Sequence, residues 1–252
     1  MSILKMKVPF VIGYCLLILV TAAPQDQVLK ELEADLQQAF KLGGDLHQEK
    51  KDVGFTGLTA GQKQDLVDYH NTARSEVSPT ASNMLKMSWS DELAEVAQNY
   101  AERCIWSHNP SRSSAPSFSY VGENLFLTSG SYNGEGVVRS WVSEVKNYNY
   151  FTLGCNGVCG HYTQVVWHDS EYVGCGAVSC NSVSGLNWSN SIIVVCNYGK
   201  GGNYRGRQPY TQGRSCSACP SGKVCENRLC ANPGDTGSNG SNSDSSGSST
   251  CN

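Results

Sequence analysis

The residues of this 252-residue chain best suited to chemistry are its cysteines, of which there are twelve. Four of them lie close together near the C-terminus, at Cys216, Cys219, Cys225 and Cys230. Cysteines at such spacing either hold a zinc ion as thiolates or close small loops as disulfides. The compartment decides between the two, because disulfides form and persist mainly after export.

The N-terminus predicts export. Lys5 and Lys7 precede an apolar run over residues 8–20, which fits a signal-peptide core better than a membrane span. Small residues at Val20-Thr21-Ala22 offer a cleavage site, so residues 1–22 are expected to be a signal peptide, with an N-terminal membrane anchor as the alternative. We expect a secreted protein with no membrane span, in which disulfides are favoured over a zinc ribbon.

Two ionisable residues lie within apolar patterns. Val137, Trp141, Glu144 and Tyr148 share one face of a predicted helix, and a carboxylate in such a stripe needs a partner. His70 lies on the inward face of an earlier helix, and we interpret it as a buried, hydrogen-bonded structural residue. The sequence contains neither G-x-S-x-G nor H-E-x-x-H, so these signatures of a serine nucleophile and a zinc protease are absent.

Helices are expected in the first half of the chain. Residues 23–57 are interpreted either as a removed propeptide or as a helical extension that packs on the domain. Thr59 and Gln62 fit the capping box of a helix that Pro79 ends. Ser90 fits the N-cap of a second helix. The apolar stripe of this second helix comprises Leu93, Val96, Ala97, Tyr100, Ala101 and Cys104.

Strands are expected in the second half, over residues 163–167, 172–179 and 192–198, which are rich in β-branched and aromatic residues. Helices followed by strands predict an α+β layered domain with an antiparallel sheet. Residues 234–252 are rich in Gly and Ser and are predicted to be disordered.

Surface chemistry is constrained by charge and by sequons. The formal net charge is −3, which gives no electrostatic reason to bind nucleic acid or an anionic membrane. Asn187 and Asn239 each begin an N-glycosylation sequon, so both are candidate glycan sites.

Five short motifs occur in a characteristic order. They are His70-Asn71-Thr72-Ala73-Arg74, Ser107-His108-Asn109-Pro110, Gly122-Glu123-Asn124-Leu125, the run from Gly160 to Trp167, and the run from Val195 to Tyr204. Together they resemble the CAP superfamily of cysteine-rich secretory, antigen 5 and pathogenesis-related-1 proteins. The resemblance implies a CAP domain over residues 58–210, folded as a three-layer α-β-α sandwich with a central antiparallel sheet.

The cysteine-rich segment over residues 211–233 resembles the hinge of animal cysteine-rich secretory proteins. The helical domain that follows this hinge in the family, which is tied to ion-channel modulation, has no counterpart here. The resemblance implies five disulfides: Cys104–Cys180, Cys155–Cys159, Cys175–Cys196, Cys216–Cys225 and Cys219–Cys230. Cys251 is left over, and an odd cysteine in a secreted chain suggests a disulfide-linked dimer or a capped thiol.

The resemblance also carries over a cleft containing His108, Glu123, Glu144 and His161. Two imidazoles and two carboxylates could hold a divalent metal such as zinc, with the two histidines as ligands, or could act as general acid and base. The same groups could instead form a self-satisfied polar cluster without catalysis.

The function expected from this resemblance is extracellular binding of a protein or lipid, in venom, defence or signalling. The alternatives are a metal-assisted endopeptidase, which would use the four cleft residues, and a sterol or fatty-acid carrier. A carrier would use the aromatic-rich loop over residues 148–153.

Overall fold

The computed structural model describes residues 55–234, which belong to the second of two units, Gly54–Asn252. The predicted signal peptide, most of residues 23–57, and the predicted disordered segment beyond Gly234 lie outside the described residues. The same is true of Asn239 and Cys251. Within residues 55–234, no helix is long and apolar enough to cross a membrane.

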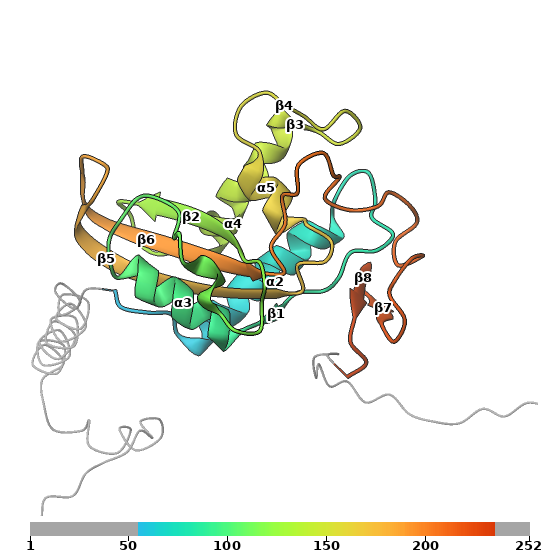
Figure 1. Ribbon diagram of the computed structural model, residues 1–252, viewed down its shortest axis with the longest axis horizontal. Helices are drawn as coiled ribbons and strands as arrows, with labels where there is room; N and C mark the ends of the chain where they lie inside the picture. Colours follow the sequence, from blue (N-terminus) through green and yellow to red (C-terminus); the bar gives the residue numbers. More distant parts are fainter. Residues whose placement is uncertain (1–54, 235–252) are drawn as a thin grey trace, which may run out of the picture. The chain divides into compact units, whose positions relative to one another are not determined.

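A four-stranded sheet forms the centre of the domain, with strand order β1-β5-β6-β2 (Figure 1). The long strands β5 (Tyr172–Val183) and β6 (Trp188–Gly199) are antiparallel, and β2 (Gly122–Thr128) pairs antiparallel with β6. The short β1 (Ser88–Trp89) pairs with β5 in parallel. The central strands are antiparallel, as the sequence predicted, and the short β1 makes the sheet mixed at one edge.

Helices cover both faces of this sheet, as Figure 1 shows. Residues from α2 (Ala60–Ser75), α4 (Gly134–Val142) and α5 (Gly160–Val165) share one apolar core with Cys196 and its same-face neighbours. The helix α3 (Asp91–Ala101) packs on the other face, in a core that includes Leu125, Val178, Ile193 and Val195. Because alternate strand residues point to opposite faces, the sheet supplies both cores. The predicted three-layer sandwich is confirmed.

The first two helices begin where the sequence predicted. Thr59 Oγ1 accepts the Gln62 N–H at 3.3 Å, and Gln62 Oε1 accepts the Thr59 N–H at 2.9 Å. Ser90 Oγ accepts the Leu93 N–H at 3.3 Å. These caps satisfy backbone donors that the first turn of a helix leaves unpaired.

Residues 163–167 were expected to form a strand, and this prediction is wrong. They lie in α5 and in the turn that follows it. Glu144 Oε2 accepts the N–H groups of His161 and Tyr162, at 3.0 and 3.2 Å, and so satisfies donors in the first turn of α5. The expected helix through Tyr148 also differs, because α4 tightens into the 3₁₀ turn η2 (Ser143–Asn147) and then enters β3 (Tyr148–Asn149).

The remaining elements are short. The 3₁₀ turn η1 (Arg112–Ser114) contacts α3, β4 (Gly154–Cys155) pairs with β3, and β7 (Val224–Glu226) pairs with β8 (Leu229–Ala231). Five disulfides join ten cysteines in the pairs that the family resemblance implied: Cys104–Cys180, Cys155–Cys159, Cys175–Cys196, Cys216–Cys225 and Cys219–Cys230. The last two stabilise the β7–β8 hairpin and the loop before it.

A buried polar network supports the face that carries α2. The His70 Nδ1–H donates to the Leu66 carbonyl at 2.7 Å, and Nε2 accepts the Tyr198 hydroxyl at 2.9 Å. Burial lowers the pKa of His70 to about 4, so the ring is neutral near pH 7. The predicted structural role of His70 is confirmed.

The guanidinium of Arg74 is also buried, and it donates to four backbone carbonyls. The acceptors are Leu85, Val165, Trp167 and His168, at distances between 2.7 and 3.0 Å. Burial lowers the pKa of Arg74 to about 9, which still leaves the group charged at neutral pH. This one side chain therefore joins α2 to the end of α5, to the turn that follows it and to the loop that contains Leu85.

Candidate metal-binding cleft

The first histidine–carboxylate pair of the cleft joins the loop after α3 to β2. His108 Nδ1 lies 2.8 Å from Glu123 Oε1, and the same oxygen accepts the Asn109 N–H at 2.8 Å. The Glu123 side chain is 1% exposed, whereas the His108 side chain is 60% exposed. A buried carboxylate thus holds an imidazole that faces solvent.

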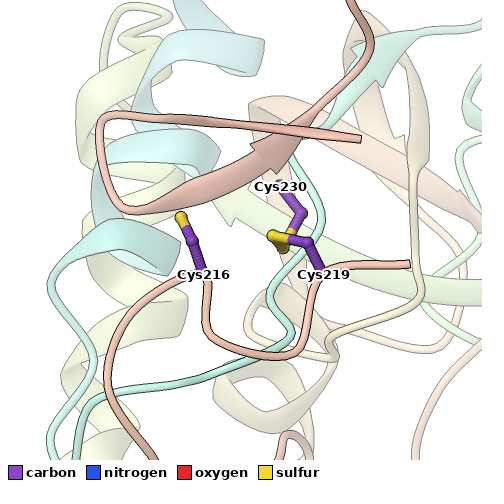
Figure 2. A group of neighbouring side chains, drawn as sticks. All are labelled: Cys216, Cys219 and Cys230. Atoms are coloured by element: carbon purple, nitrogen blue, oxygen red, sulfur yellow. A yellow bond between two sulfur atoms is a disulfide. The ribbon is translucent and has the colours of Figure 1, made fainter. Parts of the chain in front are cut away.

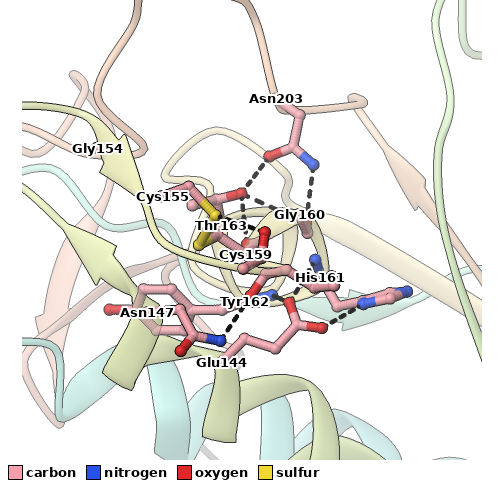
Figure 3. Close-up of a disulfide and its surroundings, with 12 residues drawn as sticks. Glu144, Asn147, Gly154, Cys155, Cys159, Gly160, His161, Tyr162, Thr163 and Asn203 are labelled. Atoms are coloured by element: carbon pink, nitrogen blue, oxygen red, sulfur yellow. Dashed lines mark hydrogen bonds and ion pairs between the residues drawn. A yellow bond between two sulfur atoms is a disulfide. The ribbon is translucent and has the colours of Figure 1, made fainter.

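The second pair joins η2 to α5, and Figure 3 shows Glu144 and His161 pointing toward each other. His161 Nδ1 lies 2.6 Å from Glu144 Oε1, while Oε2 of the same carboxylate accepts the two backbone N–H groups at the start of α5. The Trp141 ring stacks near the imidazole, with centroids 6.4 Å apart. Glu144 therefore has the partner that its place in an apolar stripe demanded.

Two asparagines lie at the cleft, Asn124 between the two pairs and Asn203 against α5, and the sequence alone assigned neither of them a role. Asn124 directly follows Glu123 in β2, and its Nδ2 donates to the His161 carbonyl at 3.1 Å. Asn203 Nδ2 donates to the Gly160 carbonyl at 2.8 Å, and its Oδ1 accepts the Thr163 hydroxyl at 2.7 Å. Both asparagines lie inside the quoted motifs, which was the one available signal.

A small pocket of about 140 Å³ opens beside the first pair. Its lining includes polar side chains from four separate segments, namely His108, Arg112, Tyr120, Glu123, Gln164 and Asn203. Neither His161 nor Glu144 is part of this lining. Among the described residues, no three of the four predicted cleft residues bring a ligand atom each within 4.8 Å of one another. The structure therefore presents two linked pairs rather than a closed four-ligand cage.

The chemistry of both pairs fits a divalent metal such as zinc. A carboxylate facing Nδ1 fixes the tautomer that carries its proton there and leaves the Nε2 lone pair available, which is the usual arrangement of a metal-binding histidine. His108 and His161 would be the ligands, and Glu123 and Glu144 would orient them. A bound zinc would supply Lewis acidity and leave coordination positions for water.

The hinge cysteines offer a different apparent ligand group. Cys216, Cys219 and Cys230 have sulfur atoms within 4.8 Å of one another, the one such cluster of three among residues 55–234 (Figure 2). All three sulfurs belong to disulfides. Because the metal ligand is the thiolate, these bonded sulfurs do not form a zinc site.

Two further predicted features lie away from the cleft. Asn187 is exposed in the turn between β5 and β6, where a glycan would have space. The aromatic loop contains Tyr148, Tyr150 and Phe151, which line a hollow of about 320 Å³, and Phe151 is 70% exposed.

Comparison of the sequence with models of known protein families gives one match. The family model described as "Cysteine-rich secretory protein family" (CAP) matches residues 67–198. The chain belongs to the CAP family. The match contains α3, β2, β5, all of β6 except Gly199, and all four predicted cleft residues.

The chain is similar to several known CAP proteins. Peptidase inhibitor 16 from Mus musculus is 46% identical over 178 residues, which cover 69% of this chain and 34% of that protein. Glioma pathogenesis-related protein 1 from Mus musculus is 43% identical, over 68% of this chain and 64% of that protein. This CAP chain thus spans only about a third of the length of the first relative.

One similar solved structure is the crystal structure of NaASP2 with Zn2+. It superposes with a TM-score of 0.54 at 28% identity and covers 69% of this chain and 97% of that one. This structural neighbour of the chain was therefore solved together with zinc.

Proposed function

We propose that this CAP protein is exported and acts by extracellular binding, with His108 and His161 forming a site for a divalent metal such as zinc. The observation that carries the proposal is the shared geometry of the two pairs. In each, Nδ1 faces a carboxylate within 2.8 Å, so each ring keeps Nε2 for an external ligand. Such oriented rings are suited to metal, since a free imidazole would lose side-chain entropy on binding.

Binding is favoured over hydrolysis because the carboxylates are already engaged. Both oxygens of Glu144 accept hydrogen bonds, Glu123 Oε1 accepts two, and Glu123 Oε2 is buried away from the pocket's solvent. A general base must instead reach a water or substrate proton. A metal-assisted endopeptidase remains the alternative to be tested on the same variants.

Calorimetric titration with zinc tests the site directly. We expect the wild-type protein to bind with a dissociation constant in the micromolar range or below. The double variant His108→Ala/His161→Ala should lose about 100-fold in affinity or more. His168→Ala is the matched control, because this histidine lies outside the cleft and its Nδ1 contacts the Pro209 carbonyl.

Equal affinity of the double variant and the wild type, with both folded, would contradict the metal site. Peptide cleavage that requires zinc and disappears in Glu123→Gln would favour the endopeptidase alternative instead.

An apolar ligand is the second candidate, supported by the exposure of Phe151 beside Tyr148 and Tyr150. Large exposed aromatics at a hollow are suited to sterol or acyl chains. Solvent extraction of natively purified protein, followed by mass spectrometry, would detect such a lipid. Protein from which no sterol or fatty acid can be extracted or reloaded would contradict this role.

A disulfide-linked dimer through Cys251 is proposed as the assembly state. Ten cysteines are paired within residues 55–234, and Cys15 falls in the predicted signal peptide, so Cys251 is the odd thiol of the mature chain. Non-reducing electrophoresis should show a dimer band that reducing agent and Cys251→Ser both abolish. A protein that stays monomeric with an unmodified Cys251 thiol would contradict the proposal.

A further inference from the structure

A second polar cluster lies beneath the first pair, inside the domain. Asn197 in β6 is 0% exposed, and within residues 55–234 neither atom of its side-chain amide has a hydrogen-bond partner. Glu123 Oε2 is also buried and without a partner. Buried polar atoms are almost always hydrogen-bonded, so three such atoms in one place point to a bound polar ligand.

These atoms are neighbours because of strand register. Asn197 is directly opposite Glu123 on β2 and opposite Gly174 on β5. Residues paired across antiparallel strands point to the same face, with Cβ atoms about 4.5–5.5 Å apart. Both side chains therefore point toward the layer that contains α3, in the same sense as Leu125 and Val195.

The floor of this cluster is formed by close backbone contact. A Cβ on Gly174 would lie 2.3 Å from the Ala94 nitrogen and 2.4 Å from the Ser90 oxygen, so the start of α3 lies directly on β5. Asn197 pairs with Glu123 on one side and with Gly174 on the other, on the face that α3 covers, and it is 0% exposed. This enclosure excludes any large ligand.

The donor and acceptor set matches water. The Glu123 carboxylate accepts only, whereas the Asn197 amide both donates and accepts. One water molecule can donate to Glu123 Oε2 and accept from Asn197 Nδ2, and it keeps a hydrogen for a third contact. A buried water typically makes about three hydrogen bonds.

We propose that Glu123 and Asn197 enclose an internal water site, and that Asn197 acts through this water as a positioning residue for His108. The terminal torsion of a glutamate is soft, so a carboxylate held at one oxygen alone can rotate. Holding Oε2 keeps Oε1 aimed at His108 Nδ1 and keeps Nε2 turned outward. The water site follows from the buried contacts alone, whereas its consequence for zinc rests on the proposed function.

The test compares Asn197→Leu, which has similar volume and no amide, with Ser191→Ala on the same strand. Ser191 is 1% exposed and bonds the Ser189 carbonyl, so this control removes a buried polar group away from the cleft. In metal-free protein, nitrogen-15 spectra of the His108 ring should move from the Nδ1–H tautomer toward Nε2–H in Asn197→Leu only. Zinc affinity should fall about 10-fold in the same variant.

A high-resolution crystal structure of the wild type should show water within hydrogen-bond distance of Glu123 Oε2 and the Asn197 amide. Its absence, or a direct amide–carboxylate bond, would overturn the water site, and this measurement holds even if Asn197→Leu does not fold. An unchanged His108 tautomer in folded Asn197→Leu would overturn the positioning role. If the wild type binds no zinc but the tautomer still moves, the inference stands and the proposed function fails.

Discussion

His70 and His108 contact opposite sides of one sheet, and their ring nitrogens are used differently. Both nitrogens of His70 are hydrogen-bonded within the protein, and the residue is 0% exposed. In the part of the chain that the structure describes, His108 is bonded through Nδ1 alone, and its side chain is 60% exposed. Both histidines lie in family motifs and both have hydrogen-bond partners, so these two properties do not distinguish them. His108 is the candidate ligand because its Nε2 is unused, whereas His70 uses both nitrogens and is structural.

The largest effect on stability is expected from Arg74→Met, which disrupts the buried polar network that His70 and Arg74 form. The substitution removes the Arg74 donor from the carbonyls of Leu85 and Val165, and one of two donors from those of Trp167 and His168, which keep the N–H groups of Ser170 and Leu85. We expect a loss of about 3–5 kcal/mol in the free energy of unfolding. Urea denaturation with disulfides intact measures it. Arg139→Met removes an exposed guanidinium that pairs with Glu135, and it should change stability by less than about 1 kcal/mol. Similar losses in both variants would show that the buried hydrogen bonds of Arg74 contribute no more to stability than an exposed ion pair does.

Acid should destabilise the domain through His70. Its pKa is about 4 in the folded state, against 6.5 for an unperturbed histidine, so the unfolded chain binds a proton first as the pH falls. Stability should therefore be full above about pH 6.5 and decline toward pH 4, by about 3 kcal/mol in total. Denaturation midpoints of wild type and His70→Gln across this window measure the effect. A pH profile that keeps the same slope in His70→Gln would assign the loss to other groups.

Of the three substitutions, the one at His108 in the cleft should change the free energy of unfolding least. Because the His108 side chain faces solvent and Glu123 Oε1 keeps the Asn109 N–H as a donor, His108→Ala should lower the free energy of unfolding by no more than about 1 kcal/mol. Thermal unfolding in the presence of a chelator measures it. A loss above about 2 kcal/mol would remove the distinction between the two histidines and would favour the self-satisfied polar cluster.

Local sequence patterns were enough to predict where α2 and α3 begin, because their capping residues are close to each other in the sequence. The capping box at Thr59 and the N-cap at Ser90 depend on residues three positions apart, so they are visible without a fold. His70 could be assigned a buried role for the same reason, because its apolar neighbours recur at helical spacing. The layer order followed from the family motifs.

The parts that could not be predicted depend on distant partners. The stretch over residues 163–167 has strand composition, but the carboxylate of Glu144, seventeen residues before His161, satisfies the first donors of α5. The parallel pairing of β1 joins Ser88 to Tyr172, and a two-residue strand has no periodicity to read. Asn197 looked like one polar residue in an apolar run until the register placed it opposite Glu123.

The contacts that hold the β7–β8 hairpin to the domain determine where a label or a fusion module can be joined. Lys86 Nζ lies 2.8 Å from Glu226 Oε1, Lys223 contacts Glu171 and Asn232, and the Cys230 N–H donates to the Met84 carbonyl at 2.8 Å. A fluorophore or fusion module joined directly after Gly234 would therefore start from an anchored base and report the tumbling of the whole domain. Truncation before Ala231, which is 1% exposed and pairs with Val224, would remove part of the β7–β8 hairpin. A label or fusion should therefore be joined at residue 234 and not within the hairpin.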